Sequence, residues 1–126
     1  MKPTIISIII FLSLLGFIIY ADNSLDNLCT NIEDKCILIT NSLDQNNYDN
    51  AYKLSKEILS ELNDRSFITS IYVDHNDYDT LFREALRLSS YICKQDASES
   101  YNSVKILQCN SNIIKSLHKT NFKNIF

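Results

Sequence analysis

The absence of glycine and proline from most of the chain is the strongest restriction on its fold. The only Gly and the only Pro of the 126 residues are Gly16 and Pro3, so residues 22–126 contain neither. Hairpin turns and β-bulges depend on residues that accept a positive φ angle, glycine foremost. A β-sandwich or barrel of this size without glycine would be very unusual, whereas helices can be joined by loops rich in Asn, Asp and Ser. We therefore expect an all-α fold.

An amphipathic stretch near the start of this region, residues 24–43, defines the first expected helix. Its apolar positions alternate at spacings of four and three residues, which places them on one helix face that must be buried against other helices. Asn23 or Ser24 is the expected N-cap. The seam consists of Leu25, Cys29, Ile32, Cys36, Ile39 and Leu43.

The segment before this helix has the features of a secretory signal peptide. A basic start with Lys2 precedes an apolar run over residues 4–20, and Ala21 is a small residue at the junction with a polar stretch. We expect cleavage after Ala21, which leaves residues 22–126 as a single extracellular domain. The alternative is an uncleaved membrane anchor, because about 20 apolar residues are enough to span a bilayer. No basic residue follows the run as a stop signal, which favours cleavage.

Three or four further helices complete the expected bundle. Apolar residues at helical spacing predict helices over residues 48–62, 77–95 and 98–117, with a tail that frays after about residue 120. Residues 67–73 are rich in β-branched and aromatic side chains but have no partner strand, so we expect a bend or a short additional helix there. The predicted fold is a small disulfide-stapled bundle of four or five helices after a cleaved signal peptide. The expected caps are Asp49, then Asp77 or Asp79, then Ser98 or Ser100.

The four cysteines are predicted to form two disulfide bonds, because small exported domains commonly support their cores in this way. Cys29 and Cys36 lie seven residues apart on one helix, which separates their Cα atoms by roughly 10 Å, whereas a disulfide requires about 7 Å or less. Each must therefore pair with Cys93 or Cys109. An up-and-down order of four helices favours Cys36 with Cys93 and Cys29 with Cys109, and a fifth full-length helix would reverse the choice.

The composition narrows the chemical roles that remain. Eleven basic and fifteen acidic residues after Ala21 give a net charge of −4, which disfavours nucleic acid and, once the signal peptide is removed, a membrane as partners. Phosphate-binding loops, dinucleotide fingerprints and the nucleophile elbow all need glycine. With the cysteines committed to disulfides and only His75 and His118 as histidines, we expect no catalytic residues, no metal site and no cofactor.

A binding role follows from these exclusions. We expect a secreted protein without enzymatic activity that binds an extracellular protein, as a host-directed effector of salivary or venom type or a cytokine-like factor would. The alternative is an extracellular carrier whose helices enclose a small hydrophobic ligand.

Overall fold

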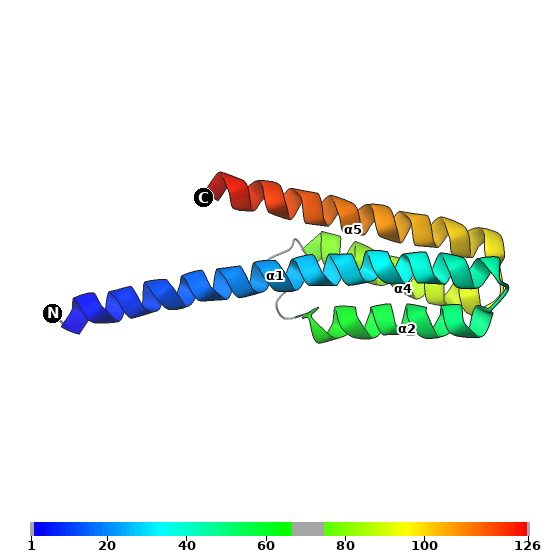
Figure 1. The fold of residues 1–126 in the computed structure, drawn as a ribbon, viewed down its shortest axis with the longest axis horizontal. Helices are drawn as coiled ribbons and strands as arrows, with labels where there is room; N and C mark the ends of the chain where they lie inside the picture. The colour runs from blue at the N-terminus through cyan, green and yellow to red at the C-terminus, as the bar shows by residue number, and fades with distance from the viewer. Residues whose placement is uncertain (1, 67–74, 126) are drawn as a thin grey trace.

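Four α-helices pack side by side in the computed structural model, which describes the backbone of residues 2–66 and 75–125 and the side chains of residues 2–66 and 76–117. They are α1 (Lys2–Asp44), α2 (Tyr48–Asp64), α4 (His75–Cys93) and α5 (Ala97–Ile125). Consecutive helices run antiparallel, and α1 and α4 each pack against both α2 and α5 (Figure 1). The described residues contain no strand, so the all-α prediction is confirmed. The bend or helix expected over residues 67–73 lies outside the described residues.

Helix α1 is far longer than the amphipathic pattern predicted. It begins at Lys2 and runs without interruption through Asn23 and Ser24, so the predicted start at those residues was wrong. Its C-terminal half lies in the bundle, whereas its N-terminal half projects from one end with its apolar side chains exposed (Figure 1). The helix continues because no Gly or Pro lies between residues 17 and 44 to end it, and the polar residues at the junction are compatible with a helix interior.

The bundle core is built around the predicted seam of α1. All six seam positions are at most 3% exposed, so this prediction is confirmed, and Ala21 and Leu28 extend the same buried face. Burial of each large apolar side chain contributes about 1.5–3 kcal/mol relative to its exposure to water. The other helices supply Ala51, Ile58 and Leu62 from α2, Leu81, Ala85, Leu88 and Ile92 from α4, and Val104, Leu107 and Ile114 from α5.

Three apolar residues at helical spacing in α5 are not part of the core. The spacing predicted Leu117 on the buried face of this helix and Ile106 and Ile113 at its edges, but Ile106, Ile113 and Leu117 are 46%, 50% and 54% exposed. Helix α5 contacts only α1 and α4 among the described helices, so a narrow line of its residues is covered. These three side chains lie outside that line.

The two turns at the end of the bundle opposite the N-terminus form without glycine. Asn46 and Gln95 take positive φ angles of 54° and 58°, which non-glycine residues adopt at some conformational cost. The residues that follow, Asn47 and Asp96, each donate a backbone N–H to a carbonyl five residues earlier, at 2.8 and 3.0 Å. These are Schellman motifs, which end a helix and satisfy its last carbonyl groups.

The same two residues cap the helices that come next. The side chain of Asn47 accepts a hydrogen bond from the Asn50 backbone N–H, and Asp96 does so from Glu99, both at 3.2 Å. Each short turn therefore ends one helix and starts another within three residues. The predicted caps were wrong because they lie one or more residues inside the helices (Asp49 in α2, Asp77 and Asp79 in α4, Ser98 and Ser100 in α5).

Candidate functional site

The four cysteines are free thiols, and neither predicted disulfide is formed. Cys29 and Cys36 are buried, as the seam predicts, but Cys93 and Cys109 are exposed. Cys93 directly follows the buried Ile92, and one residue rotates a side chain by about 100° around a helix. The disulfide-stapled part of the predicted fold was therefore wrong. An up-and-down order of helices does not bring thiols together when one pair faces the core and the other faces solvent.

Burial makes the two core thiols weak nucleophiles. Desolvation raises the pKa of Cys36 to about 12, and the nearby Glu33 carboxylate adds to the rise. Desolvation also raises the pKa of Cys29, against the opposing effect of a hydrogen bond with Ser111. Because the thiolate is the reactive form of cysteine, these two residues are suited to packing and not to nucleophilic chemistry.

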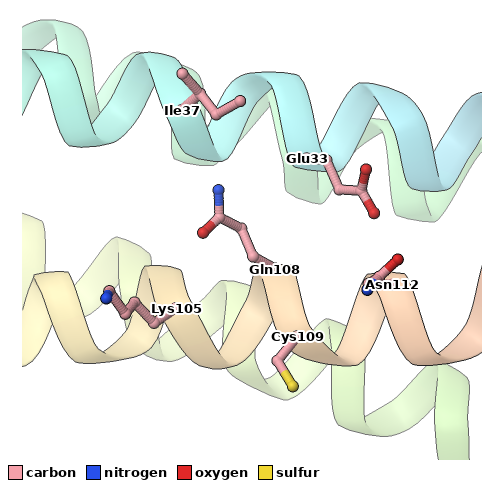
Figure 2. Close-up of a pocket in the computed structure, with 6 residues that line it drawn as sticks. All are labelled: Glu33, Ile37, Lys105, Gln108, Cys109 and Asn112. Atoms are coloured by element: carbon pink, nitrogen blue, oxygen red, sulfur yellow. The ribbon is translucent and has the colours of Figure 1, made fainter.

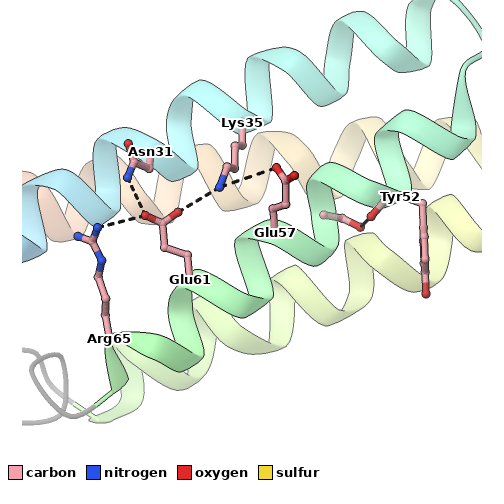
Figure 3. Close-up of polar contacts among 7 residues, drawn as sticks. Asn31, Lys35, Tyr52, Glu57, Glu61 and Arg65 are labelled. Atoms are coloured by element: carbon pink, nitrogen blue, oxygen red, sulfur yellow. Dashed lines mark hydrogen bonds and ion pairs between the residues drawn. The ribbon is translucent and has the colours of Figure 1, made fainter.

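A polar cluster on the face between α1 and α2 centres on Glu61 (Figure 3). Its carboxylate accepts a hydrogen bond from Asn31 Nδ2 at 2.6 Å and lies 3.3 Å from both Lys35 Nζ and an Arg65 guanidinium nitrogen. Arg65 also donates to the backbone carbonyl of Ser24 at 2.6 Å. Only 14% of the Glu61 side chain is exposed, so water screens these contacts incompletely. The cluster holds α2 in register against α1.

This cluster was not predicted, although the sequence contains a signal for it. Asn31 and Lys35 are four residues apart beside the seam of α1. Glu57, Glu61 and Arg65 repeat the same spacing on α2. Residues four apart share a helix face, so each set could have been recognised as a polar edge flanking the apolar contact.

A second internal polar contact joins α4 to α5. Glu84 is 7% exposed, and its Oε1 accepts a hydrogen bond from Ser103 Oγ at 2.8 Å. Its other oxygen lies 3.6 Å from Arg87 on the same helix. The carboxylate is thus held by donors of the bundle itself, which indicates a structural role.

A hollow between α1 and α5 is the best candidate for a binding surface among the described residues (Figure 2). Its volume is about 520 Å³. Glu33 and Gln108 point into the space between the helices, whereas Cys109 points away from α1. Glu33 Oε1 is buried without a hydrogen-bond donor in the described part of the chain, and Ile37 is 53% exposed at the edge. The lining residues are Glu33, Ile37, Lys105, Gln108, Cys109 and Asn112.

This mixture of groups is suited to recognition. An unsatisfied carboxylate oxygen favours a partner that presents a hydrogen-bond donor. Amide and ammonium groups nearby can orient such a partner, and the exposed apolar side chain can be covered by it. Within residues 2–66 and 76–117, no three His, Cys, Asp or Glu side chains lie close enough to hold a metal ion. The side chains of His75 and His118 lie outside the described residues.

The largest exposed apolar surface belongs to the N-terminal half of α1. Among the described helices, α1 is the one long and apolar enough to cross a membrane, a property that signal sequences share. Its large apolar side chains are between 39% and 62% exposed over Ile5, Ile6, Ile8, Ile9, Ile10, Phe11, Leu12, Leu14, Phe17, Ile19 and Tyr20.

Comparison with known proteins adds a family assignment. The family model of DUF4363, a domain of unknown function, matches residues 19–125. The match begins where the exposed apolar segment of α1 ends, and it includes α2, α4 and α5. No curated protein and no solved structure matches the chain. Because the matched region covers most of its length, the chain belongs to the DUF4363 family.

Proposed function

We propose that this protein is a helical bundle that remains attached to a membrane through the N-terminal half of α1 and acts by binding a partner protein on the exported side. The observation that supports the attachment is the continuity of α1 from Lys2 into the bundle core. The proposal keeps the extracellular binding role expected from the sequence. It differs in that the leader stays on the chain.

The dimensions and exposure of the segment support a membrane span. Residues 4–20 extend about 26 Å as a helix, close to the roughly 30 Å of a hydrocarbon core. Exposed apolar side chains are unfavourable in water and favourable in lipid. Ala21 is fully buried in the bundle, so cleavage after it would remove a side chain from the core.

The charges that flank the span support export of the bundle. Lys2 precedes the span, whereas Asp22 and Asp26 follow it and the next basic residue is Lys35. Positively charged flanks stay on the cytoplasmic side during insertion. This asymmetry favours an N-terminus in the cytoplasm and a bundle on the opposite side.

Carbonate extraction of membranes from expressing cells tests the attachment. We expect the full chain in the membrane pellet, with an intact mass that includes the residues before Asp22. Leu12→Arg should shift it out of the pellet, because arginine at the centre of a span costs about 2.5–3.5 kcal/mol. Ile37→Arg is the matched control, since Ile37 is similarly exposed but lies in the bundle. Recovery from the medium of a chain that begins at Asp22 would contradict the attachment and favour a secreted protein.

The hollow between α1 and α5 supports the binding role. A photo-cross-linking residue at Gln108, which points into the hollow, should give a discrete adduct with a partner protein in native membranes. The same residue at Ser90, an exposed position on α4, is the control. Equal yields at the two positions would contradict binding at this surface.

A carrier of a small hydrophobic ligand has less support. The seam between the helices is filled by side chains that are at most 3% exposed. The hollow described above lies at the surface, and it mixes polar and apolar groups.

A further inference from the structure

Helix α5 runs toward the end of the bundle from which the apolar half of α1 emerges (Figure 1). Two contacts define how α5 and α1 are aligned. Ser111 Oγ donates a hydrogen bond to the Cys29 carbonyl at 3.2 Å, and Lys115 Nζ lies 3.9 Å from Asp26 Oδ1. Along an antiparallel pair, each further residue of α5 is matched by one residue closer to the N-terminus of α1.

This alignment brings the last turns of α5 to the level of the proposed membrane surface. With equal rise per residue, position 119 is level with about residue 22 and position 123 with about residue 18. Helix α5 continues to Ile125, past the point where the apolar segment of α1 begins. Helix α2 ends at Asp64, and the next residue, Arg65, contacts the carbonyl of Ser24, so α2 ends near the level of residue 24 of α1. Of these two helices, α5 reaches further toward the membrane.

The sequence of this part of α5 is basic and partly apolar. No acidic residue follows Glu99, and lysines recur every fourth residue at positions 115, 119 and 123. Lys115 Nζ donates a hydrogen bond to Thr30 Oγ1 at 3.0 Å, which holds this lysine against α1. Ile113 and Leu117 are half-exposed on the preceding turns. Basic side chains at the level of a membrane surface are attracted to anionic lipid headgroups. The chain as a whole carries a net negative charge, so the net charge of this end of α5 is opposite in sign to that of the whole chain.

We propose that the C-terminal turns of α5, residues 119–125, dock on anionic phospholipid headgroups of the bilayer that holds α1. The inference rests on the membrane attachment proposed above. Lysines within about 8 Å of an anionic leaflet, one Debye length at physiological salt, are attracted to it. The contact would fix the end of α5 at the membrane surface and set the orientation of the bundle on the membrane.

Fluorescence of the full chain in lipid nanodiscs tests this proposal. The exposed thiols are removed by Cys93→Ser and Cys109→Ser, and the environment-sensitive dye NBD is attached through Asn121→Cys. Discs of phosphatidylcholine are compared with discs in which about a third of the lipid is phosphatidylglycerol, and we expect about twofold brighter emission in the anionic discs. Salt at about 0.5 M should remove most of the difference, because it shortens the screening length.

Charge variants show whether the lysines are responsible. Lys119→Glu with Lys123→Glu should abolish the difference between the two kinds of disc. Lys53→Glu with Lys94→Glu makes the same change in charge at exposed positions away from this end, and should retain it. A dye at Ser98, at the start of α5, should respond to neither lipid.

The possible results separate this inference from the attachment on which it rests. A chain that fails to co-elute with the discs overturns both. A chain that co-elutes but emits equally in the two lipids overturns the docking surface alone, as does a response that survives Lys119→Glu with Lys123→Glu. Emission that rises with the number of chains per disc, and not with phosphatidylglycerol, would place a second copy of the chain on this surface and also overturn the proposal.

Discussion

Alkaline pH should destabilise the bundle through the thiol of Cys36. Burial raises the pKa of this thiol to about 12 in the folded chain, from an ordinary value near 9.0. Between these values the unfolded chain has lost the thiol proton and the folded chain has kept it. The unfolded state then binds fewer protons, so the free energy of unfolding falls as the pH rises.

The size of the effect follows from the two pKa values. The stabilisation that comes from keeping this buried thiol protonated is present in full well below about pH 9. The free energy of unfolding falls by about 2 kcal/mol between about pH 8 and pH 10.5, and nearly all of that fall occurs above about pH 9. Typical domains have free energies of unfolding of about 5–15 kcal/mol, so this loss is measurable. Lysine and tyrosine side chains also titrate in this range, and a difference between two variants cancels their effect.

Urea unfolding of wild type and Cys36→Ala, followed by circular dichroism in detergent micelles with a reductant, provides that difference. At about pH 8 the variant should be the less stable, because it leaves a small cavity. The difference in free energy of unfolding between wild type and Cys36→Ala, called the gap here, should shrink by about 2 kcal/mol at about pH 10.5, since only wild type has the buried thiol. Cys93→Ala, which removes an exposed thiol, is the matched control for loss of a cysteine. A change in the Cys36→Ala gap below about 0.5 kcal/mol would refute the reasoning.

Three further predictions concern the thiols, the polar cluster and the core. A maleimide reagent should modify two of the four cysteines in the folded protein and all four after denaturation, as read by intact mass, whereas four unreactive cysteines would indicate disulfides. Glu61→Gln should lower the free energy of unfolding by about 1–2 kcal/mol, while Glu57→Gln, with a 43% exposed side chain 4.0 Å from Lys35, should change it by about 0.5 kcal/mol or less. In the same urea assay, Ile32→Ala in the core should lose about 2–5 kcal/mol and the exposed Ile37→Ala about 0.5 kcal/mol or less, and equal losses would contradict the assigned burial.

The parts of the fold that the sequence predicted correctly depend on repeating signals. The seam from Leu25 to Leu43 combines regular spacing with uniformly apolar or thiol side chains, and every member is buried. The lack of glycine likewise excluded sheet architectures in a way that applies to the whole chain. Signals of this kind average over many residues, so a local irregularity does not change them.

The errors arose where a conclusion depended on a single residue or on a direction in space. Cys93 lies one position beyond a core residue, and that step was enough to place its thiol in solvent. The turns at Asn46 and Gln95 use positive φ angles in residues other than glycine, and the spacing of apolar residues does not identify which turn residue adopts them. The start of α1 was misplaced because Asn23 and Ser24 are good caps that can also be accommodated within a longer helix.

The Glu61 cluster and the hollow beside Glu33 could not be predicted from the sequence for a similar reason. Both depend on which helices are neighbours, and adjacent helices are selected by packing of the whole bundle. The four-residue spacing of Glu57, Glu61 and Arg65 marks a polar edge, but it does not identify Asn31 and Lys35 as the partners. That pairing follows from the register of α2 on α1.

Because α1 is unbroken, the proposed membrane span and the first helix of the bundle form one rigid rod. Its first half would share the tilt of the lipid around it, and its second half is a structural member of the bundle, so a tilt in one is a tilt in the other. From residue 21 to Asp44 the helix extends about 35 Å, and a change in tilt of about 10° would swing the distal turns sideways by about 6 Å. Stretching or thinning of the bilayer would thus be converted directly into displacement of the surface farthest from it.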